Sequence, residues 1–313
     1  MRLFTNIQSN LSLRFRRLLS GAPDGIPPWV AVVAAGDEPG LYLPTDAPWV
    51  VHRDFGTLVG GIRALLMQAL HPGSLAGVSQ HSRYESDPLG RLAGTIRWLT
   101  VTTFGSQSAV QSEADRVNRL HSRVTGNYVD AKQREQTYRA ADPNLLLWVH
   151  VAFMESFLSA HLEYVSGSIP KGISPTGPDN YVKQWGESVA PLGLKNVPHN
   201  TAEMDGVLDE FRDGGQLAVT DETLRVIQFI RKPPLPRSTK PVYNLLFQAA
   251  VVSLRPEFRK MLGLKTAPKW FIRIQARWLL RLLRAAVGSH SPVEEAALER
   301  LRRIGAWEES AEK

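Results

Sequence analysis

The chain has 313 residues, of which 43% are hydrophobic and 21% charged, a composition typical of a globular protein with a sizeable core. Its 37 Lys and Arg against 30 Asp and Glu give a net charge of +7, and no concentrated basic stripe falls on a recognisable nucleic-acid-binding module, so we expect no nucleic-acid partner. There is no cysteine, which excludes disulfides, thiolate catalysis and iron–sulfur clusters.

A cysteine-free chain fits a reducing compartment. Arginines interrupt the first 19 residues, so these do not have the apolar core of a signal peptide. No window approaches about 18 uncharged apolar residues, and we therefore expect no membrane-spanning helix and a cytoplasmic location.

The first half of the chain predicts helices after an irregular start. Residues 1–50 are rich in Pro and Gly and predict a lead-in with at most one short helix. Helical spacing of apolar residues predicts a helix over 57–70 that Pro72 ends. Asp87-Pro88 is a helix start signal for a segment running to Gly105. A third helix is predicted over 109–125.

The second half continues the helical pattern. Asp142-Pro143 repeats the start signal ahead of a long apolar helix. Shorter helices and loops follow over 167–240, one of them capped by Thr220 or Asp221, with a Pro-rich loop at 232–241. Helices over 241–254 and 268–286 precede a polar tail, 291–313. With no alternating strand pattern, we predict an all-α single domain of about 8–12 helices over 51–290.

A polar stretch, 71–95, contains His71, His81, Arg91 and Thr95. Arg91 and Thr95 are four residues apart and share one face of a helix that is apolar elsewhere. A buried guanidinium needs an anion. On the residues alone, the favoured anion is a carboxylate, with a phosphate or a cofactor propionate as the alternative. The candidate carboxylates belong to Glu85, Asp87 and Asp142, the last two of which are more typical of helix caps.

Two further histidines lie in apolar settings. His121 shares a predicted helix face with Val117, Leu120 and Val124, and His150 lies within the long apolar helix. A buried imidazole without a partner costs about 1–3 kcal/mol. The simpler interpretation is a core histidine bonded to a backbone carbonyl, and the alternative is a ligand to a metal or cofactor.

The helix predicted over 268–286 is amphipathic. Arg273, Arg277, Arg281 and Arg284 form one stripe, and Phe271, Ile274, Trp278 and Leu282 form another. Packing of the apolar stripe in the core is the favoured interpretation. The alternative is an interfacial helix on an anionic membrane surface.

Three blocks of the sequence together resemble a known family. They are residues 58–106, the segment RVNRLHSRVTG at 116–126, and 138–158, with a closing section at 235–264. In order and spacing they are similar to the MpaB-like oxygenases, which include the catalytic domain of rubber oxygenase (latex-clearing protein). The resemblance covers roughly 45–260. It implies an all-α fold that buries a non-covalent b-type haem between helices.

Residue by residue, the resemblance implies roles for the polar positions. Arg91 and Thr95 match the Arg and Thr of an Arg-x-x-Lys-Thr motif on the oxygen-binding side of the haem. The Lys of that motif is Gly94 here, which puts cleavage of rubber itself in doubt. His121 matches the axial iron ligand, and His150 is the second choice. His71 and His81 are expected to line or brace the pocket.

The implied activity is that of a haem-dependent oxygenase. Its substrates would be O2 and an apolar, isoprenoid- or lipid-like molecule, with no obligate protein partner. Two alternatives remain open. One is a non-catalytic haem carrier or sensor, and the other is a helical lipid-binding scaffold.

Overall fold

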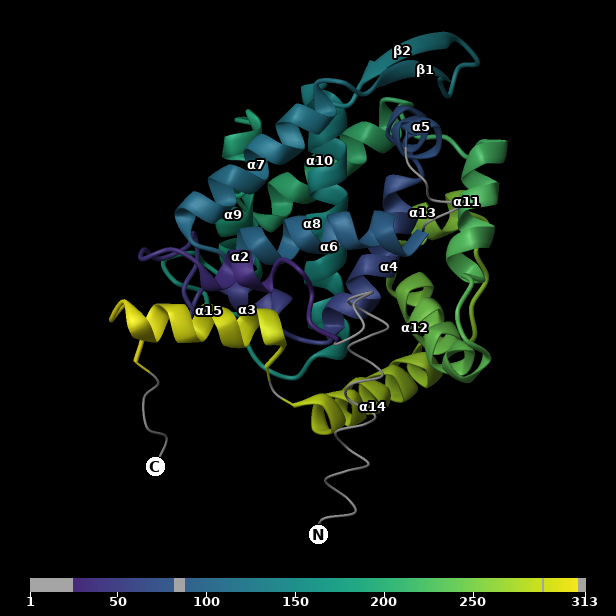
Figure 1. Cartoon of the computed structure of the whole chain (residues 1–313). Coiled ribbons are helices and arrows are strands. Elements are labelled where there is room, and N and C mark those ends of the chain that lie inside the picture. Colours follow the sequence, from purple (N-terminus) through teal and green to yellow (C-terminus); the bar gives the residue numbers. More distant parts are fainter. Residues whose placement is uncertain (1–24, 82–87, 289, 309–313) are drawn as a thin grey trace.

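The computed structural model describes residues 25–81, 88–288 and 290–308 (Figure 1). The first part contains α2 (Val30–Ala34), α3 (Ala47–His52), α4 (Gly56–Gln68), α5 (Pro72–His81), α6 (Pro88–Phe104), α7 (Gln107–His121), β1 (Thr125–Val129), β2 (Glu135–Arg139) and α8 (Pro143–Tyr164). Then come α9 (Gly177–Glu187), η1 (Ala190–Leu192), α10 (Thr201–Asp213), α11 (Asp221–Arg231), η2 (Arg237–Thr239), α12 (Lys240–Ser253), α13 (Pro256–Met261), α14 (Lys269–Val287) and α15 (Pro292–Arg303). The predicted all-α class is confirmed.

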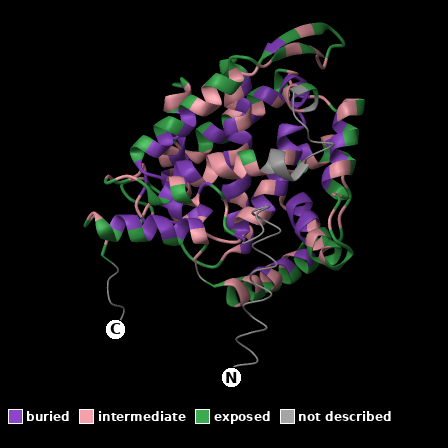
Figure 2. Ribbon diagram, in the orientation of Figure 1, coloured by how far each residue is buried: buried purple, intermediate pink, exposed green. Residues whose placement is uncertain are grey.

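α8 is the central helix, and α4 packs along it. The predicted cap is present, since the Asp142 carboxylate accepts hydrogen bonds from the backbone N–H groups of Asn144 and Leu145. By length and composition α8 could cross a membrane, but 67% of its most apolar window is buried inside the protein. Figure 2 shows this burial along α4 and α8, which identifies α8 as a core helix.

The contact between α4 and α8 combines a close approach with a buried ion pair. A Cβ added to Gly60 would lie 2.6 Å from Cδ1 of Phe157, so only glycine permits this spacing. One turn further, the Arg63 guanidinium donates to the Glu155 carboxylate, and both side chains are buried. Removing one partner of such a pair would leave an uncompensated charge in the core.

The two ends of the chain differ from the prediction. The described part of the expected lead-in forms α2 and α3, which bury Trp29, Val33 and Trp49. The expected polar tail contains α15, an amphipathic helix that buries Val293 and Leu301. Its apolar residues are spaced among many charged ones, and this dilution hides the core-facing stripe in the sequence.

Two elements near the polar stretch are also absent from the prediction. Pro72 begins α5 as well as following α4, because proline suits the first turn of a helix. After α7 the chain forms an antiparallel hairpin in which Thr125 pairs with Arg139 and Val129 with Glu135. The hairpin is mostly exposed, so its strands lack the apolar alternation by which strands are recognised.

For α14, the core-packing interpretation of the apolar stripe is wrong. Trp278 is 59% exposed and Leu282 63%, and Phe271 and Ile274 are exposed as well. The helix is instead buried through Ile272, Ala276 and Leu280, which follow one another at four-residue spacing. The sequence thus contains two apolar stripes on one helix, and only one of them packs.

Candidate functional site

A group of buried rings forms where α3, α8 and α9 meet, which we call the histidine–aromatic cluster: His52, His150, Phe157, Tyr181 and Trp185. The His52 ring centroid lies 4.5 Å from that of Trp185 and 5.4 Å from that of Phe157, in both cases edge to face. The His150 ring is stacked toward Trp185 at 6.5 Å with an interplanar angle of 24°. Aromatic side chains therefore surround both imidazoles.

His52 is held by hydrogen bonds at both ring nitrogens. Its Nδ1 lies 2.8 Å from the Thr103 hydroxyl and its Nε2 lies 2.9 Å from the Tyr181 hydroxyl. Because Thr103 donates its only hydroxyl proton to the Leu99 carbonyl, Nδ1 carries the imidazole proton and Nε2 accepts from Tyr181. Burial lowers the pKa of His52 to about 3 and raises that of Tyr181 well above its usual range. Both groups are neutral at physiological pH.

His150 differs from His52 in having a free ring nitrogen. Its Nε2 is buried and has no hydrogen-bond partner among the described residues. Burial lowers the pKa of His150 to about 3, so the imidazole is neutral. A neutral imidazole with an available lone pair is the form that ligates a metal ion.

His161, four residues after Phe157 on the same face of α8, is not among the site residues predicted from the sequence. Both of its ring nitrogens are buried without a hydrogen-bond partner in the part of the chain that the structure describes. Burial lowers the pKa of His161, and its electrostatic influence lowers that of His52. The spacing 150, 154, 157, 161 along one apolar helix was the signal that placed these residues on one face.

His71 lies elsewhere, at the start of α5. Its Nδ1 accepts hydrogen bonds from the backbone N–H groups of Gly73 (3.2 Å) and Ser74 (3.4 Å). Its ring lies 6.4 Å from that of Trp148, and burial lowers its pKa to about 4. Trp148 and His150 project about 200° apart on α8. His71 therefore braces α5 on the side of α8 opposite the histidine–aromatic cluster.

His121 ends α7 just before the hairpin and is half-buried. Its neighbour Leu120 is 54% exposed, whereas Val117 and Val124 are half-buried, so the expected apolar face around His121 is buried only in part. The His121 carbonyl accepts a hydrogen bond from the N–H of Val124, which starts the turn into β1. The structure thus places His121 at a helix end and His150 in the core.

The motif residues of α6 are described in part. Thr95 is half-buried and lies on the same side of α6 as Leu99 and Thr103, the partner of His52. Arg91 is within α6, but its side chain and that of His81 lie outside the described residues. The same holds for Glu85 and Asp87, two of the carboxylates considered as partners of Arg91.

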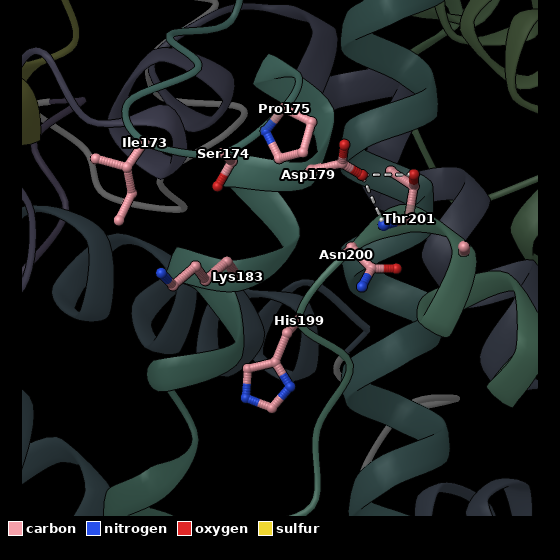
Figure 3. Close-up of a pocket in the computed structure, with 9 residues that line it drawn as sticks. Ile173, Ser174, Pro175, Asp179, Lys183, His199, Asn200 and Thr201 are labelled. Carbon is pink, nitrogen blue, oxygen red and sulfur yellow. Dashed lines mark hydrogen bonds between the residues drawn. The ribbon is translucent and has the colours of Figure 1, made fainter.

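A separate hollow of about 500 Å³ lies between α9 and α10 (Figure 3), and none of the predicted site residues line it. The one acidic residue among the described residues that line it, the half-buried Asp179, accepts hydrogen bonds from Thr201 N (3.0 Å), Thr201 Oγ1 (2.7 Å) and Thr176 Oγ1 (2.6 Å). These bonds lower the pKa of Asp179. The carboxylate therefore joins the starts of two helices, a structural role.

Fold and site together define an all-α protein with a neutral cluster of histidines and aromatic rings in its core. Residues 49–288 match the family described as "ER-bound oxygenase mpaB/B'/Rubber oxygenase, catalytic domain". The chain belongs to this family of oxygenase catalytic domains.

The relatives found by sequence share about a quarter of their residues with this chain. One uncharacterized protein from Mycobacterium bovis and one from Mycobacterium tuberculosis are each 27% identical over 229 residues, covering 71% of this chain and 85% of theirs. No solved structure matches.

Proposed function

We propose that the protein binds one haem b per chain without a covalent link and oxygenates or oxidatively cleaves an apolar, isoprenoid- or lipid-like alkene with O2. The observation that carries this proposal is the oxygenase family match over residues 49–288. The all-α fold is consistent with this oxygenase family, and the buried histidines of the core support the choice of haem as the cofactor.

The described residues fit a haem in their chemistry. A haem requires a neutral imidazole ligand and an apolar, largely dry surround. His150 offers a buried Nε2 without a partner among the described residues, and Phe157 and Trp185 supply aromatic walls. His121 is the residue that matches the family's axial ligand, so His121 is our first choice and His150 the second.

When bound, haem would supply the iron at which O2 is activated. The chain's own part would be to hold the cofactor, to exclude water through its aromatic walls, and to orient oxygen and substrate through Thr95 and Arg91. Cleavage of one carbon–carbon double bond by one O2 gives two carbonyl groups, each with one oxygen atom from O2. This reaction balances without another reductant.

The first experiment is a hemin titration of the full chain, followed by absorbance near the Soret band. We expect saturation at one haem per chain. His121→Ala is expected to abolish or strongly shift the band while far-UV circular dichroism stays that of the wild type. His199→Ala is the matched control, since that ring is on the surface with 65% of its side chain exposed.

The outcomes separate the candidate ligands. Normal haem binding by His121→Ala together with loss in His150→Ala would transfer the ligand role to His150. No Soret band in the wild type, from haem-supplied cells or on titration, would overturn the cofactor proposal.

A second experiment distinguishes an enzyme from a haem carrier or sensor. The haem-loaded protein is incubated under ¹⁸O2 with a panel of terpenoid and unsaturated lipid substrates. We expect carbonyl products that carry label in both halves. Haem binding with no turnover on the panel would favour the carrier or sensor, and a folded protein without haem would favour the lipid-binding scaffold.

A further inference from the structure

The positive charge of the chain is concentrated in one part of it. Residues 223–293 contain 14 Lys and Arg and a single acidic residue, Glu257. The remaining residues carry 23 Lys and Arg against 29 Asp and Glu, so they are net negative. This segment contains most of α11, all of α12 and α13, and α14. The net charge of +7 therefore comes from this one region.

The same region has the largest run of exposed apolar side chains in the described chain, which we call the α14 stripe: Trp270, Phe271, Ile274, Trp278 and Leu282. Each of the five is 43% to 66% exposed. A hollow of about 560 Å³ between α12 and α14 extends this apolar surface as far as Pro241 and Leu245. Scattered single exposed hydrophobics are ordinary, but a contiguous stripe marks an interaction surface.

The arginines of α14 hold the helix so that the stripe faces outward. Arg273 donates to the Glu163 carboxylate (2.6 Å), Arg277 to the Glu163 carbonyl (2.9 Å) and Arg284 to the Asp54 carboxylate (2.7 Å). Arg281 lies 3.3 Å from the Ser166 hydroxyl. The arginine stripe flanks the buried face of α14 and anchors the helix to the end of α8 and to the α3–α4 link. The apolar stripe is left exposed.

Three further cations lie close to the stripe and its hollow along the chain. Lys265 precedes α14, Lys240 is next to Pro241 of the hollow, and Arg237 lies three residues before Lys240; all three are exposed. None of them forms an ion pair within the described residues. Apolar and tryptophan side chains rimmed by cations are the pattern that binds the interface of an anionic bilayer, where each nearby cation contributes about 1 kcal/mol.

We propose that the α14 stripe and its rim of cations dock the protein on an anionic phospholipid surface. A second copy of the chain fits the same face poorly, because a two-fold contact would bring two strongly positive regions together. Anionic lipid neutralises these charges while it accepts the tryptophan and aliphatic side chains.

The test is co-sedimentation of the full chain with vesicles of phosphatidylcholine and phosphatidylglycerol (7:3) or of phosphatidylcholine alone. We expect binding to the anionic vesicles at low salt, weakened at high salt, and little binding to the neutral ones. The double variant Trp278→Ser/Leu282→Ser is expected to partition about tenfold less or lower, since exposed apolar side chains no longer enter the bilayer.

Two further variants sharpen the result. Ile173→Ser, at a 91% exposed residue between α8 and α9, is the matched control and is expected to bind as the wild type does. Arg237→Glu/Lys240→Glu/Lys265→Glu is expected to lose the salt-sensitive binding. Circular dichroism and thermal melting check that each variant folds. We expect all of them to fold, because the substituted side chains are exposed.

No binding to anionic vesicles at low salt, or wild-type binding by Trp278→Ser/Leu282→Ser, would overturn the proposal. If light scattering instead shows a dimer that this double variant dissociates, without vesicle binding, the face belongs to self-association and the proposal is also wrong. Vesicle binding is measured without haem or turnover, so the result tests membrane docking independently of the proposed oxygenase activity.

Discussion

Single buried imidazoles in this core are kept neutral by their surroundings. Burial lowers the pKa of His52 and His150 to about 3 and that of His71 to about 4. In the unfolded chain a histidine titrates near 6.5. Between these values the unfolded state binds more protons than the folded state, so the free energy of unfolding must fall as the pH falls.

We therefore expect acid to destabilise the protein from about pH 6.5 downward. Each such imidazole contributes up to about 1.4 kcal/mol per pH unit, and this stability is fully present above pH 6.5. His52→Gln removes one titrating group, and its unfolding free energy should depend less steeply on pH. Urea unfolding at pH 7, 6 and 5 measures the slope.

The matched control is His199→Gln on the surface. An unchanged slope in His52→Gln would mean that His52 is not kept neutral by the fold. The absolute stability of that variant is expected to be lower at pH 7, because the hydrogen bonds to Thr103 and Tyr181 are altered.

At the scale of the helices, α4 contains two neighbouring glycines, and only one of them faces α8. Gly60 meets Phe157, while a Cβ added to the next residue, Gly61, would find nothing within 4 Å. Both residues lie in the interior of α4, where alanine is the better helix former. Comparing alanine substitutions at these two glycines therefore separates the effect of the packing contact from the effect of helix propensity.

We expect opposite effects from two single substitutions. Gly60→Ala should destabilise the protein by about 1–3 kcal/mol, because the added methyl group overlaps Phe157. Gly61→Ala should stabilise it by about 0.5–1 kcal/mol through backbone entropy. Chemical denaturation of both variants checks this, and equal changes in the two would contradict the packing of α4 on α8.

For the molecule as a whole, α15 connects distant parts of the chain. The buried Arg300 guanidinium donates to the Val33 carbonyl and to the Phe104 carbonyl (3.0 Å), and burial lowers its pKa to about 10. α15 therefore joins α2, from the start of the described chain, to the end of α6. α15 is therefore part of the core.

Loss of a single α15 core side chain is expected to affect the whole fold. Leu301→Ala should lower the free energy of unfolding by about 2–5 kcal/mol, because Leu301 is fully buried. Glu299→Ala, on the exposed side of the same helix, should change it by less than about 0.5 kcal/mol. Similar small effects of both would show that α15 contributes little to the core.

Local signals determined much of the helical framework. The Asp142 cap and the Thr220 capping box are contacts between residues a few positions apart, so the sequence shows them directly. The Pro-rich break before α12 is a local signal as well. The long apolar run of α8 likewise predicts a buried helix, whatever its position in the fold. For the candidate site, the sequence indicated His150 as a core imidazole, and the family resemblance pointed to His121, whose role stays a prediction.

Tertiary structure decided which faces of these helices meet. His52 and Tyr181 are 129 positions apart, and no local pattern indicates that their side chains share a hydrogen bond. On α14 the sequence offers two apolar stripes, and only Ile272, Ala276 and Leu280 are buried because Glu163 and Asp54 hold the arginine side of the helix against the body. Helix formation depends on neighbours in the chain, whereas the burial of a helix face depends on which residues, distant in the sequence, pack against it.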